Sequence, residues 1–167
     1  FGVVKLTTES RTTFDFTLPR RDSKAAPGHK GFTVSLEADL DPREAAARRD
    51  FTINALMWDP QEETMLDFFG GEKDLRDGIL RHTSAAFPED PLRVLRGMQF
   101  ASRFNLKAAP ETVALCRSIK HTHPELARER VREEWFKWAA QSKTPSLGLH
   151  FLVEKVSLCA YPGNYDS

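Results

Sequence analysis

Hydrophobic and polar positions alternate through the first 18 residues in a way that predicts a β-hairpin. Val3 to Leu6 and Thr12 to Leu18 are β-branched and aromatic runs, and five polar residues join them. In the second run the polar side chains share one face of the strand, which leaves the carboxylate of Asp15 on a sheet surface. We interpret Asp15 either as a solvent-facing acid, or as a metal ligand or catalytic base that shares a cleft with acids from a neighbouring strand.

Residues 20 to 40 show little periodicity and many turn-forming and charged residues. A loop of this length in a compact domain is more often functional or mobile than idle. We therefore expect a flexible lid, in which Phe32 to Leu36 can form a short strand. The alternative is a plain connecting segment.

A helix is predicted to begin at Asp41, because Asp41 can cap it, Pro42 suits the first helical position and Glu44 completes a capping box. The sequence pattern extends this helix as far as Leu56.

Asp50 and Asn54 lie one turn apart on such a helix and share a face. A carboxylate beside an amide can engage a diol such as a ribose, or can orient a neighbouring arginine. Arg49 lies at the edge of the same face. We keep both interpretations open: Asp50 and Asn54 bind a sugar, or Asp50 only braces Arg49 or the preceding loop.

A second hairpin is predicted for Met57 to Phe69, with a turn at residues 60 to 63. Gly70 and Gly71 end this hairpin, since paired glycines are typical of turns. Residues 74 to 81 are expected to form a further turn that leads to the next helix.

Residues 87 to 104 predict a largely buried helix. Asp90 can cap its free N–H groups, and Pro91 fits its first position. Apolar residues recur at three-residue steps and predict the buried face: Leu92, Leu95, Met98, Ala101 and Phe104.

Arg93 and Arg96 project from a stripe beside that buried face. A guanidinium in a partly dry cleft needs an acceptor, which can be a carboxylate, a phosphate or a base edge. The simpler alternative is a salt bridge between Asp90 and Arg93 across one turn.

After Phe104 the strand signals stop, and helices are predicted at residues 110 to 120, 126 to 140 and 146 to 156. The acids and bases of the 126 to 140 helix are mostly interpreted as a solvated face. The chain is therefore expected to be α+β, divided near residue 84 into an α+β part (1–84) and a helical part (85–167).

Composition narrows the class of protein. The 167 residues are 40% hydrophobic and 29% charged with a formal net charge of zero, which indicates a globular protein. The two cysteines match no zinc or disulfide framework and favour a reducing compartment such as the cytoplasm. No apolar run approaches the length of a membrane span, so no membrane partner is expected. Both ends are abrupt, which we interpret as truncation.

Four motifs stand in a specific order. They are A-R-R-D-F-T-I-N-A-L at 47–56, D-F-F-G-G-x-x-D-L-R-D-G-I-L-R at 67–81, E-D-P-L-R-V-L-R at 89–96 and E-R-V-x-x-E at 129–134. This combination resembles the class II tRNA nucleotidyltransferases (CCA-adding enzymes) and bacterial poly(A) polymerases. The resemblance covers nearly the whole chain. It implies the last part of a polymerase β-like head, a mixed sheet with helices, followed by an all-helical neck.

The resemblance also implies a role for each motif residue. Arg49 and Asp50, with Asn54 alongside, would bind the sugar and phosphates of the incoming nucleotide. Asp90 and Arg93 would act as a protein template for the base, because a carboxylate can accept from the amino group of cytosine or adenine while the guanidinium donates to the adjacent ring acceptor. Arg96 is similar to the phosphate contact of the family.

By the same resemblance the parent protein would transfer CMP and AMP from CTP and ATP to the tRNA 3′ end, with Mg²⁺ as cofactor. The segment 81–84, Arg-His-Thr-Ser, favours the tRNA enzyme over a poly(A) polymerase. A non-catalytic nucleotide- or RNA-binding module is the other alternative.

Two departures from the family pattern matter. The family usually has arginine where this chain has Gln99, which weakens one expected contact to the triphosphate. The strand with the paired metal-binding aspartates would precede Phe1, and Asp15 alone, at an acidic position of the next strand, cannot assemble a two-metal site. The 167 residues alone are therefore expected to be inactive.

Overall fold

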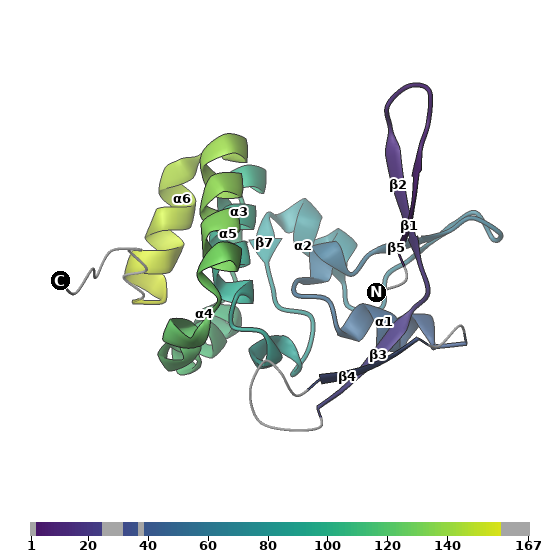
Figure 1. Cartoon of the computed structure of the whole chain (residues 1–167). Coiled ribbons are helices and arrows are strands. Elements are labelled where there is room, and N and C mark those ends of the chain that lie inside the picture. The colour runs from purple at the N-terminus through teal and green to yellow at the C-terminus, as the bar shows by residue number, and fades with distance from the viewer. Residues whose placement is uncertain (1–2, 25–31, 37–38, 158–167) are drawn as a thin grey trace. The chain divides into compact units, whose positions relative to one another are not determined.

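The structure is a computed structural model that describes residues 3–24, 32–36 and 39–157, with side chains described for residues 3–19 and 39–157. The chain forms two compact units, residues 1–45 and residues 46–167 (Figure 1).

Two antiparallel hairpins make up most of the first unit. Strand β1 (Val3–Thr7) pairs with β2 (Thr13–Thr17), and β3 (Arg20–Lys24) pairs with β4 (Phe32–Leu36). The first hairpin and the 32–36 strand confirm the predictions. Strand β3 was not predicted, because its charged sequence has low strand propensity and becomes a strand only by pairing with β4. The lid was predicted for residues 20–40, of which 25–31 and 37–38 lie outside the described residues, while 20–24 and 32–36 form the β3–β4 hairpin. Its role as a lid stays a prediction.

The β1–β2 hairpin exposes both of its faces. Directly paired residues share a face, so Val4 and Leu6 lie on the same side as Phe16 and Phe14, and all four are exposed. Asp15 lies on the opposite face, directly across from Lys5. The carboxylate of Asp15 therefore points away from the apolar side of the hairpin.

The helix predicted for residues 41–56 is much shorter in the structure. Helix α1 (Pro42–Ala47) does begin with its predicted cap, because the Asp41 carboxylate accepts the Arg43 N–H at 2.7 Å. It ends at Ala47, and only a 3₁₀ turn, η1 (Thr52–Asn54), follows.

A tertiary contact explains this early end. The backbone around Phe51 forms an antiparallel bridge with His82, in which the Thr52 N–H donates to the Arg81 carbonyl and the Thr83 N–H donates to the Asp50 carbonyl. Backbone groups that pair with a distant segment cannot continue a helix. The helical prediction beyond Ala47 was wrong for this reason.

The hairpin predicted for residues 57–69 is confirmed, with β5 (Met57–Asp59) antiparallel to β6 (Thr64–Leu66). The turn predicted at 74–81 is wrong for its first half, because helix α2 (Gly71–Asp77) continues to Asp77. Asp67 starts this helix: its carboxylate accepts the N–H groups of Gly71 (2.8 Å) and Glu72 (3.1 Å), which lowers its pKa although burial opposes that shift. Gly78, at φ 69°, ends the helix in a left-handed conformation.

The remaining elements are mostly helical. In chain order they are β7 (Ile79–Leu80), η2 (Phe87–Glu89), α3 (Arg93–Phe104), β8 (Lys107–Ala108), α4 (Pro110–Ser118), η3 (Lys120–Glu125), α5 (Arg128–Gln141), α6 (Pro145–Leu149) and the π-helical turn η4 (His150–Lys155). Strand β8 pairs in parallel with β7, so the part after residue 84 is not wholly helical.

Helix α3 is the centre of the second unit and packs against α5 and α6 (Figure 1). Its predicted buried face is confirmed except at Phe104, which is 44% exposed at the end of the helix. Gly148 lets α6 approach α3 closely, since a Cβ at this position would collide with Ser102 Oγ and the Met98 carbonyl of α3. The core of this unit is thus built around α3.

The architecture is α+β, as predicted. The expected boundary near residue 84 falls inside the second unit and stays a prediction about family domains. Among the described residues, no helix is both long and apolar enough to cross a membrane.

Candidate nucleotide-binding site

Six of the seven residues predicted for the site lie in the second unit, on two segments. Arg49, Asp50 and Asn54 belong to the stretch between α1 and the end of η1, whereas Asp90, Arg93 and Arg96 surround the start of α3. The structure brings the two segments together through direct hydrogen bonds, and it adds Arg130 and Glu134 from α5.

Asp50 is the central carboxylate of this arrangement and is only 5% exposed. Its Oδ1 accepts the Phe51 N–H and the Asn54 Nδ2, both at 2.9 Å, and its Oδ2 accepts Arg96 Nε at 2.5 Å. The predicted proximity of Asp50 and Asn54 is confirmed. Asp50 binds Arg96, and no bond between Asp50 and Arg49 is found among the described residues. Sugar binding and bracing of the preceding loop, the other interpretations of Asp50, stay predictions.

Arg96 lies between two buried carboxylates. Its Nη1 is 3.9 Å from Glu134 Oε1, which also accepts Lys137 Nζ at 2.8 Å. The guanidinium carbon of Arg96 lies 5.2 Å from the centroid of the Phe100 ring, and 30% of the side chain is exposed. We call Asp50, Arg96, Glu134 and Lys137 the inner cluster. The cluster holds Arg96 through Nε and Nη1. The Nη2 donors of Arg96 have no protein partner among the described residues.

Glu134 is the most enclosed member of the inner cluster, at 2% exposure. Its Oε2 is buried and has no hydrogen-bond partner among the described residues. A buried carboxylate with one unsatisfied oxygen is costly, so its ion pairs with Lys137 and Arg96 must offset that cost.

Asp90 and Arg93 do not pair with each other, which excludes the predicted salt bridge. Asp90 Oδ1 accepts the Leu92 N–H at 3.1 Å, as a cap does, and Oδ2 accepts Arg130 Nη2 at 2.7 Å. Assigned helical geometry starts only at Arg93, after this capped turn. We call Asp90, Arg93 and Arg130 the outer cluster.

Two backbone carbonyls hold the Arg93 guanidinium. Nη1 donates to the Ala86 carbonyl and Nη2 to the Arg48 carbonyl, each at 2.7 Å. Burial lowers the pKa of Arg93, although the charges of Asp90 and Asp50 act in the opposite direction. Each of the two nitrogens carries a second N–H, so the guanidinium keeps donors for a ligand. Its bond to the Arg48 carbonyl links α3 to the segment that contains Arg49.

Arg49 itself is exposed, and no hydrogen bond or ion pair of its guanidinium is recorded among the described residues. Gln99, where the family usually has arginine, is buried, and its Nε2 lies 3.5 Å from Gln141 Oε1. The two residues thus differ sharply in their access to a ligand.

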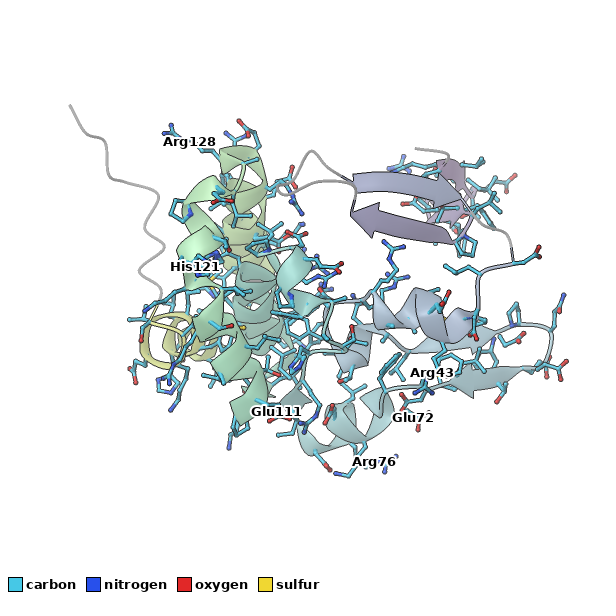
Figure 2. The ribbon with its side chains drawn as sticks, turned by 90° about the horizontal axis from the view of Figure 1, so that it is seen from below. Arg43, Glu72, Arg76, Glu111, His121 and Arg128 are labelled. Carbon is cyan, nitrogen blue, oxygen red and sulfur yellow. The ribbon has the colours of Figure 1, made fainter. Side chains whose placement is uncertain are left out.

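A second network of hydrogen bonds and ion pairs, centred on Arg81 and Asp74, supports the segment around Asp50. Arg81 Nε donates to both oxygens of the buried Asp74 (3.0 and 3.2 Å), Asp74 also accepts Thr52 Oγ1 at 2.8 Å, and Arg81 forms an ion pair with Glu111 of α4. Figure 2 shows Glu111 at the same end of the unit as α2. This network connects η1, α2 and α4 and keeps the Phe51–His82 bridge in place.

Asp15 belongs to the first unit, and its relation to this site is not defined. Its exposed carboxylate lies 3.7 Å from Lys5 Nζ. Within residues 3–24, 32–36 and 39–157, no group of three His, Cys, Asp or Glu side chains could hold a metal ion. The role of Asp15 therefore stays a prediction.

Sequence reasoning missed Arg130 and Glu134 as site residues because it interpreted the charges of the 126–140 helix as solvated. That interpretation is wrong for Glu134. A usable signal was present: Glu134 shares a helix face with Val131 and Trp138, three residues before and four after it. An acid on an apolar face of a helix is a candidate for a buried ion pair.

Comparison with known proteins shows what this chain is similar to. Residues 1–81 match the family model described as the poly(A) polymerase head domain. Residues 1–81, just under half of the 167 residues, are thus similar to this head domain, and the four motifs resemble those of class II tRNA nucleotidyltransferases and bacterial poly(A) polymerases.

Individual relatives are similar to this chain over longer or more closely matching stretches. The chain is 48% identical over 109 residues to the multifunctional CCA protein of Nitrosococcus oceani, which covers 65% of this chain and 27% of the relative. It is 41% identical over 149 residues to that of Aliivibrio salmonicida, covering 86% and 36%. A solved structure of a tRNA-processing enzyme with CTP matches with a TM-score of 0.73 and 28% identity, over 93% of this chain and 39% of that one. The chain thus spans about a third of the length of these proteins.

Proposed function

We propose that this chain supplies the nucleotide-recognition part of an RNA nucleotidyltransferase that adds C and A, from CTP and ATP, to the 3′ end of tRNA in the cytoplasm. One observation carries the proposal. Asp90 and Arg93 lie one helical turn apart, and separate partners hold each of them so that they do not neutralise each other.

The chemistry of the bases matches this pair. Cytosine and adenine each present an amino donor beside a ring acceptor, whereas uracil and guanine present the opposite polarity at the corresponding positions. An ionised Asp90 carboxylate can only accept, and the Arg93 guanidinium can only donate. A carboxylate and a guanidinium held next to each other therefore select C and A.

The inner cluster supports a contact with the sugar and the phosphates. We assign phosphate binding to Arg96, which keeps free donors, and to the exposed Arg49. Asp50 already accepts three hydrogen bonds from within the chain. Its proposed part in sugar binding is therefore mainly to orient Arg96 and Asn54, whose amide carries a further donor and an acceptor.

Mg²⁺ is the cofactor that we propose for the complete enzyme. The described residues do not fit a magnesium site, because Asp15 is a single exposed acid opposite a lysine. We assign no catalytic step to a metal here. The helices after residue 84 would correspond to the neck that follows the head in this family.

Nucleotide selection tests this function. The complete gene product is incubated with a tRNA that lacks CCA and with labelled CTP, ATP or UTP. We expect incorporation of C and A but not U, and we expect Asp90→Ala and Arg93→Ala each to relax this selection. Arg132→Ala is the matched control, because Arg132 is an exposed arginine of α5 that belongs to neither cluster.

Equal selection by the wild type and by both template variants would refute the base-reading role. Incorporation of AMP alone, repeated into a long tail, would instead identify a poly(A) polymerase.

A further inference from the structure

The orientation of the Asp90 carboxylate depends on two hydrogen bonds from different parts of the chain. The Leu92 N–H binds Oδ1 at 3.1 Å from two residues away, and Arg130 Nη2 binds Oδ2 at 2.7 Å from 40 residues away. The terminal torsion of an aspartate is soft, so one bond to Oδ1 leaves the other oxygen free to rotate. Arg130 supplies the second constraint.

Arg130 is itself well placed to act as a constraint. It lies in the first turn of α5, whose beginning is marked by Arg128 in Figure 2. One turn further along, Glu134 of the same helix pairs with Lys137 and approaches Arg96. Helix α5 therefore contacts the outer cluster through Arg130 and the inner cluster through Glu134, which sets the two clusters relative to each other.

The bridge between Arg130 and Asp90 leaves the carboxylate able to bind a ligand. The side chains of Arg130 and Asp90 are 43% and 29% exposed, so this bridge is not sealed from solvent. Each carboxylate oxygen has two acceptor positions, and Arg130 Nη2 occupies one of those on Oδ2. The remaining acceptor position then has a fixed direction.

We propose that Arg130 is a positioning residue that sets base selection by fixing the orientation of the Asp90 carboxylate. The proposal rests on the function proposed above, in which Asp90 accepts from the amino group of the base. Arg130 does not need to touch the nucleotide. A freely rotating carboxylate accepts less well from an amino group at one defined position. It can also turn away from the carbonyl oxygen of uracil, so the repulsion that disfavours uracil is lost.

A purely structural bridge would behave differently from an orienting one. Loss of a structural contact lowers the stability of the protein or slows the reaction with every nucleotide alike. Loss of the orienting contact changes the ratio between nucleotides, because only the base edge is read by Asp90. The ratio of kcat/KM for CTP to that for UTP therefore separates the two roles.

The test compares Arg130→Ala, Arg130→Lys and the control Arg132→Ala in the complete gene product. Both arginines lie on α5, two residues apart, and only Arg130 binds Asp90. Steady-state kinetics with a tRNA lacking CCA give the CTP to UTP ratio, and thermal unfolding reports the folded fraction. We expect Arg130→Ala to lower the ratio by about tenfold, the scale of one directed base contact, mainly through the KM for CTP. Arg130→Lys is expected to restore part of the ratio, and Arg132→Ala to leave it unchanged.

Three results would overturn the proposal. The first is an unchanged ratio in folded Arg130→Ala, and the second is an equal fall in Arg132→Ala. If Arg130→Ala does not fold, Arg130→Lys decides, since a wild-type ratio would show that the geometry of the guanidinium is irrelevant. A wild type that does not discriminate CTP from UTP would be a different failure, because it would refute the proposed function itself.

Discussion

The inner and outer clusters combine the same side-chain types in opposite ways. In the inner cluster the carboxylates of Asp50 and Glu134 are buried, and they bind cations of the chain. In the outer cluster Asp90 and Arg130 are partly exposed, and Arg93 is held by backbone carbonyls rather than by an acid. The inner carboxylates thus serve the protein, whereas the outer pair keeps capacity for a ligand.

This difference indicates that burial, and not residue type, decides whether an acid–arginine pair mainly stabilises the protein or remains able to bind a ligand. A buried carboxylate that loses its cation is left uncompensated in a medium of low polarity, which is strongly destabilising. An exposed ion pair contributes little to stability, because water screens both charges. We therefore expect substitutions in the inner cluster to change stability first, and substitutions in the outer cluster to change selectivity first.

The largest effect is expected for Asp50→Asn. An amide cannot accept from Arg96, Asn54 and the Phe51 N–H together, so the free energy of unfolding should fall by about 3 to 5 kcal/mol. Denaturant unfolding measures the change. Arg49→Ala is the matched control, since this exposed neighbour should change stability by no more than about 0.5 kcal/mol. A loss below about 1 kcal/mol in Asp50→Asn would mean that the inner cluster is not structural.

Asp90→Asn should give the next largest effect, and this effect should be on the selectivity between nucleotides. The asparagine amide can donate as well as accept, so discrimination of CTP against UTP should fall by about 1 to 3 kcal/mol in transition-state binding. Single-nucleotide incorporation assays measure this ratio. The free energy of unfolding should change by about 1 kcal/mol at most. A large loss of stability without a change in the ratio would assign Asp90 to the inner, structural type.

Glu134→Gln should cost less than Asp50→Asn, about 1 kcal/mol in unfolding free energy. The amide loses the charge that pairs with Lys137, but it also removes a buried anionic oxygen that has no partner. Glu134→Ala should cost more, because it leaves a cavity at a buried position. If Gln proved as costly as Ala, the charge of Glu134 would matter more than its packing.

The smallest effect is expected from salt. Raising ionic strength from about 0.1 to 0.5 M screens the partly exposed bridge between Asp90 and Arg130, so the CTP to UTP ratio should fall by about twofold or less. The triphosphate contribution cancels in this ratio. In Arg130→Ala the ratio should not depend on salt, and the same dependence there would contradict the bridge as its origin.

Local sequence signals predicted much of the fold. The β1–β2 and β5–β6 hairpins follow from alternation and turn residues, and the start of α1 follows from its cap at Asp41. The length of α1 could not be predicted, because the bridge between Phe51 and His82 joins segments that are 31 residues apart. Helix α2 was missed because its cap, Asp67, lies before the two glycines that suggested a turn.

The candidate site, like the fold, could be predicted only in part. The motif residues from Arg49 to Arg96 were found from the sequence, because their types and spacing are specific. Their partners were not, since an aspartate and an arginine at i and i+3 predict a local salt bridge that the structure replaces with Arg130 and two carbonyls.

The sequence by itself indicated the resemblance to a family, the two segments that carry the candidate residues and the residue types proposed for base selection, because these depend on residue types in a fixed order. Only the tertiary structure decided which acids are buried and which arginine each acid binds. Pairing of this kind depends on contacts between residues that are 46 positions apart, Asp50 and Arg96, and 40 positions apart, Asp90 and Arg130. No local pattern encodes the geometry of such contacts.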